Sequence, residues 1–165
     1  MNHLVRFFSL IACLAFATGC SQARASRVQV IDYGVYRVTN EKSVANSNSP
    51  TGIVRTGGTF ESSNQTETIP AKIGTAFGVR FSLPRELEKT QLKYVYMFPE
   101  MKNPANGKAF SSFESLGQEG GHGPSTGMFY NFTDPWELVV GEWTFRSFAN
   151  DQMLLEKKFS VVKAD

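Results

Sequence analysis

The stretch WTFRSFANDQMLLEKKFSVV, residues 143–162, decides the fold. On either side of its central ANDQ segment, apolar and polar side chains alternate. Trp143 and Phe145 then share one face of the first strand, and Phe159 and Val161 share one face of the second. Asn and Asp tolerate the left-handed backbone that a tight turn requires. The stretch therefore predicts two antiparallel strands joined by a hairpin turn.

The rest of the chain follows a similar pattern. Short runs of β-branched and aromatic residues alternate with Gly, Pro, Asn and Asp, and no segment has a helical period. The run from Ala76 to Leu83 alternates strictly and predicts a strand with one buried and one wet face. A polar stretch, Thr39 to Thr68, predicts a flexible excursion or an edge hairpin with at most two short strands. We therefore predict an all-β fold with a single domain over residues 28–165, an immunoglobulin-like antiparallel β-sandwich or, as the alternative, a small β-barrel.

Composition argues against two broad classes of protein. The 165 residues include 17 Lys and Arg against 15 Asp and Glu, which gives a formal charge of +2. This near balance lacks the basic excess of a nucleic-acid-binding domain, so we expect no nucleic-acid partner. Phe, Trp and Tyr make up 13% of the residues, which is far from the composition of a disordered chain.

The start of the chain predicts export. Arg6 precedes an apolar run over residues 7–17, which is about half the length needed to cross a bilayer as a helix. A positive start, a short apolar core and small residues after it are typical of a secretory signal. The small residues lead directly to Cys20, and the segment Ala17-Thr18-Gly19-Cys20 resembles a bacterial lipobox. An ordinary signal peptide, cleaved before Ser26, is the alternative.

The lipobox resemblance implies three segments. Residues 1–19 would be a lipoprotein signal peptide, and residues 20–27 would be a lipidated N-terminus with a short tether. Acyl chains on Cys20 would hold the protein on a membrane, because each buried methylene adds about 0.8 kcal/mol of binding free energy. Ser21 after the cysteine implies an outer-membrane address, with the domain in the cell envelope facing the periplasm. The only other cysteine, Cys13, lies in the signal, so the mature chain has no disulfide.

Four further segments resemble a bacterial family known only as domain of unknown function 3859. They are IDYGVY at 31–36, IPAKIGTAFG at 69–78, WELVVGEWTF at 136–145 and LEKKFSV at 155–161. The resemblance implies a compact envelope domain. It implies no activity and transfers no catalytic residue.

His122 is the one histidine that would remain after processing, and it lies in the glycine-rich segment GGHGPS at 120–125. A hydrolytic site would need His122 as a base, held by a carboxylate and within reach of a nucleophile such as Ser125. The G-x-S-x-G setting of a nucleophile elbow is absent from this segment, and too few His and Cys remain for a zinc site. Glu137 and Glu142 are interpreted as solvated charges. We therefore expect no catalytic residue, metal or cofactor.

The aromatic residues offer a candidate binding surface. Tyr94, Tyr96, Tyr130 and Trp136 could together form a platform for a sugar or for a partner protein. The alternative is that they fill the core of a sandwich that has no disulfide, and the exposure of two or more on one face would distinguish the two interpretations.

The sequence thus predicts a non-catalytic lipoprotein of the bacterial cell envelope. We expect it to be a binding or accessory module for an envelope protein or glycan, held at the membrane through Cys20. A small envelope hydrolase that uses His122 is the alternative.

Overall fold

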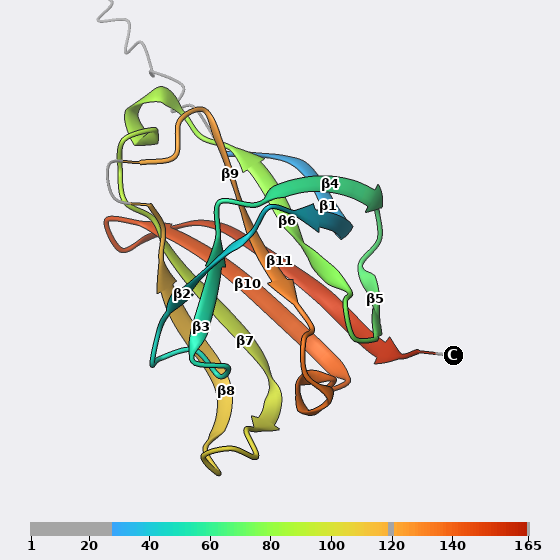
Figure 1. Cartoon of the computed structure of the whole chain (residues 1–165). Helices are drawn as coiled ribbons and strands as arrows, with labels where there is room; N and C mark the ends of the chain where they lie inside the picture. The colour runs from blue at the N-terminus through green and yellow to red at the C-terminus, as the bar shows by residue number, and fades with distance from the viewer. Residues whose placement is uncertain (1–27, 119–120, 165) are drawn as a thin grey trace, which may run out of the picture.

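The computed structural model describes residues 28–118 and 121–164, and these residues form strands with two short 3-10 turns. Figure 1 shows the strands arranged in two layers. The strands are β1 (Gln29–Thr39), β2 (Lys42–Ala45), β3 (Ile53–Thr56), β4 (Thr59–Asn64), β5 (Thr68–Ala71), β6 (Ala76–Ser82), β7 (Lys93–Lys102), β8 (Ala109–Leu116), β9 (Ser125–Asn131), β10 (Gly141–Ala149) and β11 (Gln152–Lys163). The turns are η1 (Arg85–Leu87) and η2 (Pro135–Glu137).

Two sheets form the sandwich. One has the order β4-β1-β6-β9, and the other has the order β5-β11-β10-β7-β8. Neighbouring strands are antiparallel except β5 and β11, which are parallel. The two sheets stay separate in the described part of the chain, so the immunoglobulin-like sandwich is confirmed and the small barrel is not formed.

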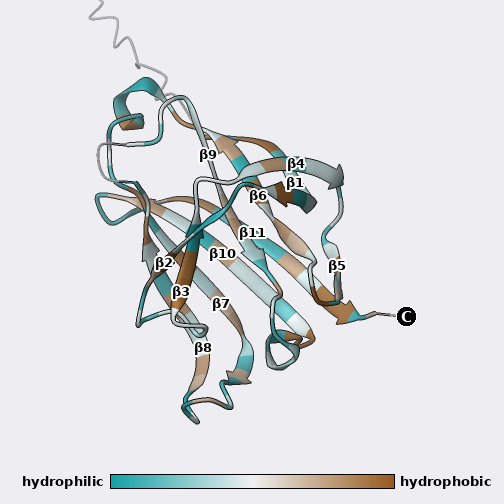
Figure 2. Cartoon of the chain, in the orientation of Figure 1, coloured by the Kyte–Doolittle hydropathy of each residue, from teal (hydrophilic) through white to brown (hydrophobic). Residues whose placement is uncertain are grey.

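The predicted C-terminal hairpin is present. Strands β10 and β11 pair from Gly141 opposite Val161 to Ala149 opposite Gln152. Asn150 and Asp151 both have positive φ, 48° and 61°, as the favoured two-residue hairpin turn requires. Figure 2 shows hydrophilic and hydrophobic residues alternating along this sheet.

The core lies between the two sheets and is mainly aromatic. Phe77 of β6 contacts the rings of Trp143, Phe145 and Phe159 on the opposite sheet. All four side chains are almost completely buried. Such packing holds the layers together by burial of apolar surface, at roughly 25 cal/mol per Å².

Strand β6 is buried on both faces, which corrects the prediction of one wet face. Phe77, Val79 and Phe81 face the core, but Ala76 and Gly78 on the other face are buried as well. The ring of Phe129 on β9 covers this outer face, and a Cβ on Gly78 would lie 2.7 Å from that ring. Phe129 also contacts Tyr36 and stacks on Phe60, so the outer face has a small aromatic cluster of its own.

The polar stretch Thr39 to Thr68 is more ordered than the sequence predicts. It contains β2, β3 and β4, and its last residue begins β5. Strand β4 extends the four-stranded sheet beside β1, whereas β2 and β3 pair with each other and with no other described strand. The edge-hairpin alternative therefore holds for β2 and β3, and the flexible excursion is wrong for β4. Strand β4 is polar because it is an exposed edge strand with only Phe60 partly buried.

The described residues contain no helix of the length and hydropathy needed to cross a membrane. The predicted signal, Cys20 and the tether up to residue 27 lie outside the described residues.

Candidate functional site

A cavity of about 920 Å³ lies along β9, with the β2–β3 hairpin over it. Strand β9 ends one sheet and β8 ends the other, so this side of the sandwich is open between them. Figure 1 shows the hairpin crossing in front of this opening. Ser49 and Pro50 at the hairpin tip are buried, and the Asn103 amide after β7 donates a hydrogen bond to the Pro50 carbonyl at 2.8 Å. The hairpin thus forms the outer wall of the cavity.

Three of the four aromatic residues singled out from the sequence line this cavity. Tyr94 and Tyr96 come from β7 and Tyr130 comes from β9, and each is less than 9% exposed. They therefore form no exposed platform, because their rings pack in the core. Trp136 is half-buried on η2, packs against the core and is not part of the cavity wall.

The tyrosine hydroxyls of the cavity are protonated at neutral pH, and burial moves their pKa values further above it. Burial raises the pKa of Tyr94 to about 12 and also raises the pKa of Tyr96. The pKa of Tyr130 is raised by burial and further by the negative charge of Glu137. Each hydroxyl can therefore both donate and accept a hydrogen bond.

Three neutral polar side chains of the cavity wall lie close to one another. The Tyr94 hydroxyl lies 2.9 Å from Thr126 Oγ1 and 3.5 Å from His122 Nε2, and Thr126 Oγ1 lies 3.3 Å from His122 Nδ1. Burial lowers the pKa of His122, which favours the neutral imidazole. The ring lies against Gly117, where a Cβ would come within 2.3 Å of Nε2. We call Tyr94, Thr126 and His122 the hydroxyl–imidazole cluster.

His122 has no carboxylate partner in the described residues. Ser125 lies on the cavity wall, but its hydroxyl has no hydrogen bond to the imidazole. The described residues also contain no group of three His, Cys, Asp or Glu side chains placed to hold a metal.

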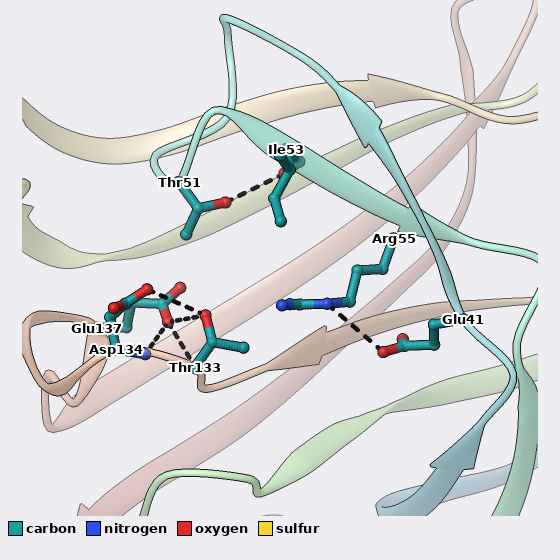
Figure 3. A network of polar contacts seen from close by, with 7 residues as sticks. All are labelled: Glu41, Thr51, Ile53, Arg55, Thr133, Asp134 and Glu137. Atoms are coloured by element: carbon teal, nitrogen blue, oxygen red, sulfur yellow. Dashed lines mark hydrogen bonds and ion pairs between the residues drawn. The ribbon is translucent and has the colours of Figure 1, made fainter.

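The cavity wall also includes charged residues, and Figure 3 shows two of them, Arg55 and Glu137, with their polar contacts. Arg55 of β3 forms an ion pair with Glu41 at 3.6 Å, and its guanidinium points towards the segment around Thr133 and Glu137. Burial raises the pKa of Glu41, although the charge of Arg55 acts in the opposite direction.

Glu137 is almost completely buried, which corrects its interpretation as a solvated charge. Its carboxylate accepts hydrogen bonds from the Tyr130 hydroxyl at 2.6 Å, from the Thr133 amide at 2.7 Å and hydroxyl at 2.9 Å, and from the Asp134 amide at 2.7 Å. The sequence signal for this role is the Asp134-Pro-Trp-Glu137 segment, which forms a capping box on η2.

The remaining wall is poor in aliphatic side chains. The aromatic members are Phe60, Tyr94, Tyr96, Phe113, Phe129 and Tyr130, and the aliphatic members are Pro50, Ile53, Val54 and Leu116. Uncharged polar residues form half of the rest, namely Ser49, Thr51, Thr56, Thr59, Ser115, Gln118, Ser125, Thr126 and Asn131.

Comparisons with known proteins agree with the fold. Residues 24–161 match the model of a family described as a domain of unknown function, DUF3859. A crystal structure of an immunoglobulin-like protein from Pseudomonas aeruginosa is similar, with 30% sequence identity and a TM-score of 0.60. The similarity covers 83% of this chain and 98% of that one. No curated protein is significantly similar to the chain.

Proposed function

Because this chain belongs to the DUF3859 family, whose description carries no activity, we propose from its own residues that it is a non-catalytic binding module of the bacterial cell envelope. The observation that carries the proposal is the cavity between β8 and β9. Its volume is within the range of small-ligand sites, about 300–1,000 Å³, and it combines ring surfaces with a few convergent polar groups.

The surroundings of His122 favour binding over catalysis. A neutral imidazole between two hydroxyls can orient a ligand, because each ring nitrogen can take one fixed hydrogen-bond role. General-base activation of a nucleophile would instead need a partner that stabilises the imidazolium, and burial disfavours that charged form.

The proposed anchor is the lipid on Cys20. With Ser21 next in the chain, we propose attachment to the outer membrane with the domain facing the periplasm. The described domain begins at Val28, so the tether of residues 20–27 can span no more than about 30 Å when fully extended. Ligands of this module would therefore be found near the membrane surface.

Two measurements test the proposal. Intact-mass analysis of the exported protein should show a chain that begins at Cys20 and carries acyl groups, and Cys20→Ala should leave it without them. An unacylated chain that begins at Ser26 would exclude the anchor.

The cavity is tested separately with Ser115→Trp, which places a large ring on the β8 wall. Ligands extracted from the envelope should raise the thermal midpoint of the wild-type protein and not that of the variant. The variant Thr39→Val, at an exposed position, serves as the control. An envelope substrate that is hydrolysed by the wild-type protein, but not by His122→Ala, would overturn the non-catalytic assignment.

A further inference from the structure

The wall of the cavity points to the chemical class of its ligand. Among the described residues, six aromatic rings line it against four aliphatic residues, and uncharged polar residues form half of the remainder. An acyl chain would be expected in a pocket lined with aliphatic groups, since hydroxyls and amides left without partners are costly to bury. Aromatic rings among hydroxyls and amides instead suit a ligand that has both apolar C–H surfaces and many hydroxyl groups.

Three of the four charged residues described in the cavity wall are already engaged within the protein. Arg55 is paired with Glu41, Arg80 is paired with Asp32, and Glu137 accepts four hydrogen bonds from its own surroundings. Lys42 lines the cavity as well, but it is exposed on β2. A phosphate or polyanion would be expected where several cations converge on free space, and the described wall has no such convergence.

The hydroxyl–imidazole cluster instead supplies uncharged hydrogen-bond donors and acceptors. The Tyr94 and Thr126 hydroxyls can each donate or accept, and the His122 ring nitrogens offer one donor and one acceptor. A sugar hydroxyl is also both donor and acceptor, so it can join this cluster without leaving a buried polar group unpaired.

We propose that the cavity binds a neutral saccharide, with a sugar ring against the half-buried aromatic residues of the wall, Phe60, Phe113 and Phe129, and its hydroxyls bonded to the hydroxyl–imidazole cluster. This inference rests on the proposed binding function and gives that function its ligand class. It also requires the β2–β3 hairpin, whose buried tip accepts a hydrogen bond from Asn103 at Pro50, to admit the sugar.

The test uses the full mature lipoprotein in lipid nanodiscs and titrations followed by calorimetry. The neutral probes are the trimers of N-acetylglucosamine and of glucose. The other probes are a galacturonate trimer, myristate and adenosine monophosphate. At least one neutral trimer should bind saturably, while the anionic probes should show no saturable binding.

Two cavity variants localise the binding. Tyr94→Phe and Thr126→Val each remove one hydroxyl of the cluster and should weaken sugar binding about 2- to 10-fold, the effect of one neutral hydrogen bond. Thr39→Val on the exposed end of β1 is the matched control and should leave the affinity unchanged. Circular dichroism melting of each variant establishes that it is folded.

The outcomes separate this inference from the proposed function. Saturable binding of myristate or of adenosine monophosphate that Ser115→Trp weakens would overturn the saccharide as the ligand class. The proposed binding function would then still stand. Equal sugar affinities of the wild-type protein, Tyr94→Phe and Thr126→Val would show that the sugar does not bind at the hydroxyl–imidazole cluster. If no probe binds, and envelope extract does not raise the thermal midpoint, both the saccharide inference and the proposed binding function are overturned.

Discussion

At the scale of single residues, Glu137 is a buried charge stabilised by hydrogen bonds. Its carboxylate accepts two backbone amides and two hydroxyls, and it joins the end of β9 to η2 before β10 begins. Hydrogen bonds to a charged group stabilise by about 1.5–3 kcal/mol each, and removing one partner leaves buried donors unsatisfied. Tyr130 and Glu137 thus form one structural unit at the wall of the cavity.

We predict that Glu137→Gln lowers the free energy of unfolding by about 2–4 kcal/mol, because an amide NH₂ would face donors that need an acceptor. Urea unfolding followed by circular dichroism measures the change. Glu142→Gln is the control, since the Glu142–Lys158 pair is exposed and should contribute less than about 1 kcal/mol. Equal losses in the two variants would contradict the structural role of Glu137.

His122 makes stability depend on pH in a predictable direction. Because burial lowers the pKa of His122 in the folded state, the unfolded chain takes up its proton first as the pH falls through about 6.5. The native state should therefore lose stability between pH 7.5 and pH 5.5. In His122→Gln, which keeps a donor and an acceptor but does not titrate, the loss over this interval should be smaller. Urea midpoints at the two pH values test this, and identical pH slopes would exclude it.

At the scale of elements, the β2–β3 hairpin is the least supported part of the described fold. Its strands pair only with each other, and a two-stranded hairpin is marginally stable alone. Asn40 and Gly57 at its two ends have positive φ, 60° and 70°. Below it lies the cavity rather than a packed core. Local opening should therefore begin here.

Asn103→Asp tests the hairpin contact. The aspartate keeps the acceptor that binds the Ala105 amide but loses the donor to the Pro50 carbonyl. We expect amide hydrogen exchange over residues 42–56 to become about 2- to 10-fold faster, as for the loss of one hydrogen bond, while exchange in β10 stays unchanged. Uniformly faster exchange would instead indicate global destabilisation.

The strands that sequence patterns predict best are those with apolar alternation. Strands β6, β10 and β11 follow that rule because one face of each meets the other sheet. Strands β2 and β4 could not be predicted in this way, since their side chains are mostly exposed and polar. Their place is set by backbone pairing, which leaves little trace in side-chain hydropathy.

At the scale of the whole molecule, the candidate site is assembled from distant segments. Tyr94, Tyr96 and Tyr130 were singled out as aromatic residues, and the alternation along β7 and β9 points them inward. That they meet at a cavity depends on the open side between β8 and β9, which is a property of the strand order. Arg55 was missed because it lies in the polar stretch interpreted as a flexible excursion or an edge hairpin, where no side chain was expected to face a site.

The sandwich as a whole depends on packing between its sheets, since no cysteine follows Cys20. Phe77 is fully buried and contacts five rings, those of Tyr130, Phe132, Trp143, Phe145 and Phe159. Truncating such a side chain removes contacts with both sheets and leaves a cavity, at a cost of about 3–5 kcal/mol. Domains of this size have a total stability of about 5–15 kcal/mol, so this is a large fraction.

We predict that Phe77→Ala lowers the free energy of urea unfolding by about 3–5 kcal/mol, whereas Phe110→Ala, at a half-buried position on edge strand β8, costs less. Tryptophan fluorescence and far-ultraviolet circular dichroism measure the transition in each variant. Trp143 lies in the core beside Phe77, so its signal should change together with the loss of strand structure if one core holds both sheets. Two separate transitions in the wild-type protein would mean that the sheets unfold independently, and Phe77 would then not be the contact on which the sandwich depends.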